Sequence, residues 1–212
     1  MVEKSEYFVR APTFERDFFL PFKGKKNLEL GCGNGIFQRL LGLDSFGLDI
    51  DLGYLRANPC RHLVCASIDD TPLKEESFDS VFVIGALEYA NYPKGFGEVL
   101  RVTKKGGFLC FTLPNLLSIA SLHRFILIAL NHYSFKGEPL PRQKTYANPF
   151  TSFAMLFDNR FKVVKMSGAE VFFTVIPIKG KCVIPALEAL LPNFVKILFG
   201  RETYYILQKK RQ

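Results

Sequence analysis

Two carboxylates and a run of glycines near the amino end have the types and spacing needed to hold a nucleoside that carries an amine. Glu29 stands two residues before Gly31, and the pattern E-x-G-x-G-x-G continues through Gly33 and Gly35. Glycines adopt positive φ cheaply and let a ligand lie against the backbone, and N–H groups at a following helix start can point at it. Asp49 ends the next apolar run, where a carboxylate can accept hydrogen bonds from ribose hydroxyls. These residues predict a nucleoside cofactor site.

The same spacing discriminates between cofactors. The dinucleotide fingerprint needs a third glycine where this chain has Ile36, which disfavours NAD and FAD. A carboxylate at Glu29 would repel a pyrophosphate, but it suits an amino-acid ligand whose ammonium group it can help to hold. The pattern therefore points to S-adenosylmethionine.

These side chains need a strand, a turn, a helix and a second strand to position them. Residues 27–30 form a short apolar-biased run that predicts the first strand. The spacing then predicts a helix over roughly 34–41, which closes at Gly42, and a second strand over 45–50. Asp49 belongs to the tip of that strand, whereas Asp51 stands at the start of a further helix, where a carboxylate is a good N-cap.

Four segments in order resemble the motifs of the class I S-adenosylmethionine-dependent methyltransferases of the methyltransferase type 11 family. They are LELGCGNG at 28–35, GLDID at 47–51, SFDSV at 77–81 and EVLRVTKKGG at 98–107. Together they cover about residues 26–114. Tyr89 departs from the family, which often has L-E-H where this chain has L-E-Y.

The resemblance implies a doubly wound α/β fold with a seven-stranded, mostly parallel sheet and helices on both faces. In the resembling fold the last strand inserts antiparallel between strands five and six. Because 212 residues suit one core, we expect a single methyltransferase domain over 1–212. A substrate-pocket insertion is expected at about 114–150, and the leading segment could cover the cofactor through Tyr7 or Phe14.

The glycine turn, the acidic tip and the ends of the third and fourth strands make up the expected cofactor site. The family's adenine-contacting Asp falls on Ser67, whose hydroxyl can still accept a hydrogen bond, and Asp69 or Asp70 could substitute for it. The residues expected to bind S-adenosylmethionine are Glu29, Gly31, Cys32, Gly33, Gly35, Asp49, Ile50, Ser67, Ile68, Ile84 and Ala86.

No catalytic residue is specified by the sequence. The sulfonium of the cofactor already activates the methyl group, so the protein mainly has to align a nucleophile. Glu88, Tyr89, His123 and His132 are candidate bases only if they face that methyl group.

Missing motifs favour a small-molecule or lipid-like acceptor over nucleic acid. The chain has IGAL at 84–87 instead of the N-P-P-[FYW] run of amino-group methylases. Its only Pro-Cys pair, at 59–60, precedes the third strand and so does not match the cytosine-C5 enzymes. An RNA or protein methyltransferase stays open as an alternative, as does a cofactor-binding regulator or inactive partner subunit with the same fold.

The composition bears on partners and compartment. A net charge of +8 and a pI near 9.3 favour contact with phosphates, RNA or an anionic membrane surface, or serve solubility alone. The apolar stretch 116–133 could line an acceptor pocket or lie on a membrane surface, but it is too short to span a bilayer.

Five cysteines without a preceding signal peptide predict a reducing cytoplasm. Cys60, His62 and Cys65 lack a fourth zinc ligand at a matching spacing, so we expect no metal site.

Overall fold

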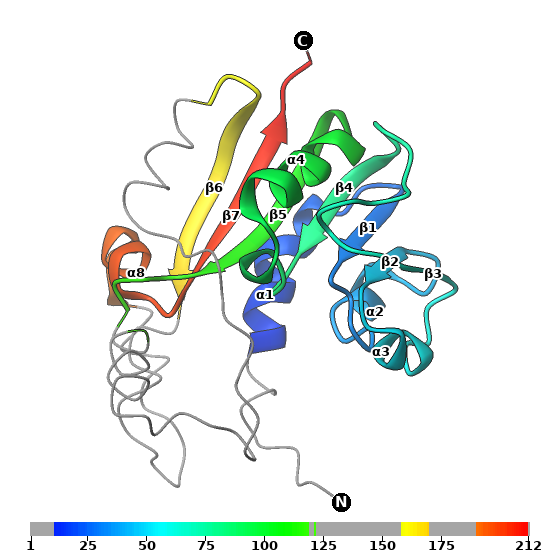
Figure 1. Cartoon of the computed structure of the whole chain (residues 1–212). Helices are drawn as coiled ribbons and strands as arrows, with labels where there is room; N and C mark the ends of the chain where they lie inside the picture. The colour runs from blue at the N-terminus through cyan, green and yellow to red at the C-terminus, as the bar shows by residue number, and fades with distance from the viewer. Residues whose placement is uncertain (1–10, 119–120, 122–157, 170–189, 212) are drawn as a thin grey trace, which may run out of the picture.

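The computed structural model describes residues 11–118, 121, 158–169 and 190–211, and a seven-stranded sheet forms its centre (Figure 1). The strand order is β3-β2-β1-β4-β5-β7-β6. Strands β1 to β5 pair in parallel, whereas β7 runs antiparallel to both of its neighbours. The doubly wound sheet with an inserted last strand is therefore confirmed. The strands are β1 Asn27–Leu30, β2 Phe46–Asp49, β3 His62–Cys65, β4 Phe78–Val83, β5 Thr103–Pro114, β6 Phe161–Ala169 and β7 Glu202–Lys209.

Helices cover both faces of the sheet, with α1 and α4 on opposite sides (Figure 1). Among the described residues, no helix has the length and apolar character needed to cross a bilayer. The helical elements are α1 Ala11–Phe19, η2 Leu20–Phe22, α2 Gln38–Leu41, α3 Leu52–Arg56, η3 Leu87–Tyr89, α4 Tyr92–Val102 and α8 Asn193–Phe199.

Strand β4 separates two hydrophobic clusters because successive side chains point to opposite faces of a sheet. Val81 and Val83 pack in the cluster that contains α4, whereas Phe82 packs in the cluster that contains α1. The Phe82 ring lies 5.6 Å from the ring of Phe37, which in turn meets Phe19 at 6.2 Å. Each such buried side chain contributes about 1.5–3 kcal/mol. Leu30, just before the glycine turn, packs in the first cluster, and Phe37, just after it, packs in the second. The turn is therefore held to the sheet at both of its ends.

The helix after the glycine turn starts later than the sequence predicts. The expected range was 34–41, but α2 begins only at Gln38. Gly35 has a φ of +80°, a left-handed conformation that cannot belong to a right-handed helix. Ile36 consequently lies in the turn with 42% of its surface exposed instead of on the buried helix face. The turn is thus longer and more open than expected.

The carboxyl ends of the parallel strands carry the glycine turn and the residues that follow β4 and β5. Asn115, directly after β5, is buried, and its side chain donates hydrogen bonds of 2.9 Å to the carbonyls of Ile197 and Leu198 in α8. This contact anchors the start of the expected insertion. Most of that insertion, residues 119–120 and 122–150, lies outside the described residues, as do Tyr7 and the side chain of Phe14.

Candidate cofactor and methyl-transfer site

Asp49 joins the second strand to the glycine turn. It ends β2, and its Oδ2 accepts a 2.8 Å hydrogen bond from the Gly33 N–H while its Oδ1 accepts one of 2.9 Å from the Asp51 N–H. Each carboxylate oxygen has two lone pairs, so each can still accept a hydrogen bond from a hydroxyl. The acidic tip and the turn are thus brought together, as the sequence predicts.

Backbone N–H groups in the first part of the turn are used within the protein and do not point at a ligand. Gly31 and Cys32 both donate to the Leu48 carbonyl, at 2.7 and 3.0 Å, and Gly35 donates to the Cys32 carbonyl at 2.9 Å. These contacts arise because the parallel ladder between β1 and β2 continues past Leu30 into the turn. These three N–H groups are therefore not available to a ligand, which would instead meet the open shape of the turn.

Two glycines leave space at the ends of neighbouring strands. Within the described part of the chain, a Cβ built on Gly33 (φ +50°) or on Gly85 (φ +63°) meets no atom within 4 Å other than those of its chain neighbours. Gly31 differs, because a Cβ there would collide with the Cβ of Ala86 and lie 3.7 Å from Ile68. The absence of a side chain at Gly31 lets the segment after β4 approach the turn, so the structure brings Gly31, Ala86 and Ile68 together.

Glu29 lies in β1 beneath the turn and is 3% exposed. One carboxyl oxygen interacts with the Gln38 N–H, while Oε2 has no hydrogen-bond partner in the described part of the chain. Burial, and then the neighbouring charges of Glu15 and Asp49, raise the pKa of this carboxyl well above its ordinary value. A buried carboxyl without a full set of partners beside an open turn is suited to meet a cationic ligand group.

Buried polar side chains that sequence reasoning missed support the turn from below. Asn58 donates to the Gly33 carbonyl at 3.2 Å and to Gln38 Oε1 at 2.8 Å, and it accepts from the Cys60 N–H at 3.0 Å. Gln38 is fully buried, and nothing in the four-residue sequence QRLL of α2 distinguishes it from its polar neighbour Arg39. Cys32 is also buried below the turn, and burial raises the pKa of its thiol to about 12, so it is unreactive.

The residues expected around the adenine ring lie on both sides of the β3 end. Ile50 follows Asp49 and is 74% exposed, so its side chain is available to a ligand. The Ser67 hydroxyl accepts a 3.1 Å hydrogen bond from the Asp69 N–H. The Asp69 carboxylate binds the Asn91 N–H, at 2.9 and 3.1 Å. Asp69 thus holds the start of α4, which makes it a poor substitute for Ser67 as an adenine contact.

Of the candidate bases, only two belong to the described residues. Glu88 is buried at 5% exposure and Tyr89 is 40% exposed, both in η3 directly after the open Gly85. Ile84 is half-buried and packs toward α1. Tyr89 therefore presents the more accessible side chain at this rim, whereas His123 and His132 lie outside the described part.

The fold and part of the sequence are similar to those of known methyltransferases. The archaeal S-adenosylmethionine-dependent methyltransferase of Archaeoglobus fulgidus superposes with a TM-score of 0.60 at 22% identity, over 94% of this chain and 93% of that one. The described fold is that of the class I methyltransferases. Residues 28–111 match the family model described as a methyltransferase domain. Residues 28–111 are thus similar to a methyltransferase domain, and S-adenosylmethionine is the cofactor that this similarity and the fold imply.

Proteins with similar sequences are named for different acceptors or are uncharacterised. An uncharacterised protein of Methanocaldococcus jannaschii is 35% identical over 44% of this chain and 44% of its own length. A malonyl-[acyl-carrier protein] O-methyltransferase of Methylovorus is 30% identical, over 49% and 42%. A tRNA U34 carboxymethyltransferase of Pseudomonas syringae is 36% identical, over 35% and 27%. The matches thus span less than half the length of these relatives.

We expect Glu29→Gln to change how stability depends on pH. The folded carboxyl has a raised pKa, so between the unfolded and folded pKa values the folded state binds more protons, and stability falls as pH rises through that window. The amide resembles the neutral acid and does not titrate. The variant should therefore match the native protein near pH 4 and exceed its Tm increasingly toward pH 8. Melting curves of both proteins across this pH range check the prediction. If Tm depended on pH in the same way in both proteins, the raised pKa of Glu29 would be contradicted.

Proposed function

We propose that this protein transfers a methyl group from S-adenosylmethionine to a small-molecule or lipid-like acceptor. The observation that carries the proposal is the contact between Asp49 and the Gly33 N–H, which sets a strand-tip carboxylate beside an open glycine turn. A carboxylate in this position suits the paired hydroxyls of a ribose. The nearby open Gly85 leaves space on the adjacent strand end for the rest of the cofactor.

The described residues fit this cofactor group by group. Asp49 would accept hydrogen bonds from the ribose hydroxyls. The unpartnered Oε2 of Glu29 would accept a hydrogen bond from the ammonium group of the cofactor. Ile50 and Ile68 would pack on the adenine ring, with Ser67 at its amino group. Bound there, S-adenosylmethionine supplies a methyl group already activated by its sulfonium. The protein's own task is to align the acceptor and exclude water.

Apolar side chains at the same rim support the acceptor class. Tyr89, Leu116 and Leu117 are 40%, 37% and 48% exposed, and binding sites for small molecules are usually lined by such groups. We further propose that residues 116–133 cover the acceptor pocket and that 1–212 form one domain. The malonyl-[acyl-carrier protein] relative is compatible with this acceptor class, while the tRNA-named relative keeps RNA as the alternative. A cytoplasmic location fits the free thiols of Cys32, Cys60, Cys65 and Cys110.

Transfer of labelled methyl groups tests the proposal. The purified protein and methyl-labelled S-adenosylmethionine are added to an extract, which is then separated into small-molecule, lipid, RNA and protein fractions. We expect label in one of the first two fractions, and none when Asp49→Ala replaces the native protein. Label in the RNA fraction, or on protein side chains instead of a carrier-bound acyl group, would contradict the acceptor class. Absence of label together with intact cofactor binding would instead support a regulatory or inactive partner subunit.

A further inference from the structure

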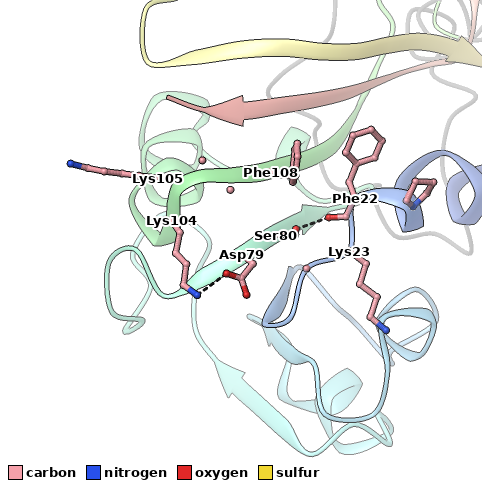
Figure 2. Close-up of a pocket in the computed structure, with 11 residues that line it drawn as sticks. Phe22, Lys23, Asp79, Ser80, Lys104, Lys105 and Phe108 are labelled. Carbon is pink, nitrogen blue, oxygen red and sulfur yellow. Dashed lines mark hydrogen bonds and ion pairs between the residues drawn. The ribbon is translucent and has the colours of Figure 1, made fainter. Parts of the chain in front are cut away.

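Two hollows lie at the amino ends of the parallel strands, on the edge of the sheet opposite the glycine turn. The first has a volume of about 220 Å³ and lies between the segment before β1 and the starts of β4 and β5. Figure 2 shows Lys104 turned toward Asp79 within it, while Lys105 extends away from it. The second, of about 330 Å³, lies between α4, the start of β5, the residue before β6 and the end of β7. Lys105 lines both hollows, so they form one continuous surface, which we call the basic edge.

The second hollow has the stronger chemical character. Its lining contains five cationic residues and no carboxylate, with Gly97 and the aliphatic Leu100 between them. A Cβ on Gly97 would meet no atom within 4 Å, so the hollow is open there. The cationic residues are Arg101, Lys105, Arg160, Lys209 and Lys210.

Part of this charge belongs to the fold. Lys209 donates hydrogen bonds of 3.0 and 2.8 Å to the carbonyls of Leu100 and Thr103, so β7 is tied to the end of α4. Four of the cations also have carboxylate partners. The pairs are Lys104 with Asp79, Arg101 with Glu98 and Arg160 with Asp158, each at 2.7 Å, and Lys209 with Glu76 at 3.3 Å.

The rest of the charge is in excess. Lys23, Lys105 and Lys210 line the hollows, and the Arg211 side chain lies over Gly106 between them. None of these four forms an ion pair within residues 11–118, 121, 158–169 and 190–211, although Lys210 is near enough to Asp158 to help lower the pKa of that carboxyl. These four positive charges on one edge are not neutralised by ion pairs with carboxylates of the described residues, so they attract a polyanion.

The shape and the neighbouring side chains distinguish between polyanions. Stable attachment to an anionic membrane combines basic residues with apolar groups that enter the lipid. None of the large hydrophobic side chains that are exposed in the described part lines either hollow. Concave hollows with cationic walls instead suit protruding phosphate groups. We propose that the basic edge binds the phosphate backbone of RNA.

This binding would be separate from the chemistry of the methyl donor. β4 runs six residues from the basic edge toward Gly85, a distance of about 20 Å at 3.3 Å per residue. RNA on the basic edge therefore does not have to be the methyl acceptor. The inference stands whichever acceptor the carboxyl edge takes.

Fluorescence anisotropy with a labelled 20-nucleotide oligouridylate tests the proposal. Lys105→Glu with Lys210→Glu should weaken binding at least tenfold at low salt, because each reversal replaces an attraction by a repulsion. For four phosphate contacts on a single strand, affinity of the native protein should fall about 50-fold from 50 to 200 mM salt. Cofactor binding and Tm should stay unchanged in the variant.

Arg56→Glu with Lys94→Glu is the matched control, since both residues are exposed and line neither hollow, Arg56 in α3 and Lys94 in the first turn of α4. It should leave RNA binding unchanged. Equal losses in the two double variants would show nonspecific attraction by the net charge, and a loss only in the control would move the RNA to the cofactor edge. Either result overturns the proposal. So would binding to vesicles of anionic phospholipid, but not to RNA, that depends on Lys105 and Lys210.

Discussion

Asp49→Ala should weaken the binding of S-adenosylmethionine by roughly 30- to 1,000-fold. The substitution removes the carboxylate that would accept the ribose hydroxyls, a loss of about 2–4 kcal/mol for a charge-assisted pair of hydrogen bonds. It also removes the 2.8 Å contact that holds the Gly33 N–H. Calorimetric titration of the native and variant proteins with S-adenosylmethionine and with its demethylated product measures the effect.

Asp51→Ala is the control two residues away. Asp51 caps α3, and its Oδ1 accepts hydrogen bonds from the N–H groups of Gly53 and Tyr54 at 2.7 and 3.2 Å. Its loss should lower the free energy of unfolding by about 0.5–2 kcal/mol and leave cofactor affinity nearly unchanged. The reverse ranking of the two variants in parallel titrations would assign the ribose to Asp51.

Gly33→Val should reduce cofactor affinity about 100-fold, equivalent to ~2.7 kcal/mol, while the protein still folds. The φ of +50° makes a branched residue cost about 1–2 kcal/mol. Apart from its chain neighbours, no atom of the described residues lies within 4 Å of the new Cβ, so the valine enters the space where the cofactor is proposed to lie. Calorimetry for the cofactor and thermal melting for the fold measure the two effects separately.

Gly106→Val provides the matched strain control. Gly106 has a φ of +79°, and the nearest atoms to an added Cβ belong to the flexible side chain of Arg211 at the opposite edge of the sheet. This variant should lose stability without losing cofactor affinity. Unchanged cofactor binding in Gly33→Val would remove the assignment of the turn.

The elements that carry the site could be predicted because their signals are local. Three glycines at alternate positions and a carboxylate at the end of an apolar run reveal the turn and the strand tip within 25 residues. The structure confirms β1 at Asn27–Leu30, Asp49 at the tip of β2 and the helix cap at Asp51, although β2 is one residue shorter at each end than the expected 45–50. The antiparallel insertion of β7 was implied by the family resemblance and is confirmed by the strand order.

The missed features depend on contacts between distant residues or on backbone conformation. The support of Gly33 by Asn58 joins residues 25 apart, and nothing around Asn58 in the sequence marks it as a partner of the turn. The helix start depended on how far the left-handed conformations extend along the turn, and all three glycines, up to Gly35, have a positive φ. The use of the turn's N–H groups by Leu48 required the register between β1 and β2.

The position of β7 between β5 and β6 also sets constraints on how the chain acquires its structure during synthesis. Residues 27–114 form β1 to β5 and the described cofactor site without β7, so this half can assemble from contacts close in sequence. β6 leaves the ribosome before β7, but it has no partner in the sheet until β7 arrives. Pairing of Phe108 with Gln208 closes a loop of about a hundred residues, a slow step. Until then the edge of β5 is unpaired, so nascent chains should be most prone to aggregation before β7 has been synthesised.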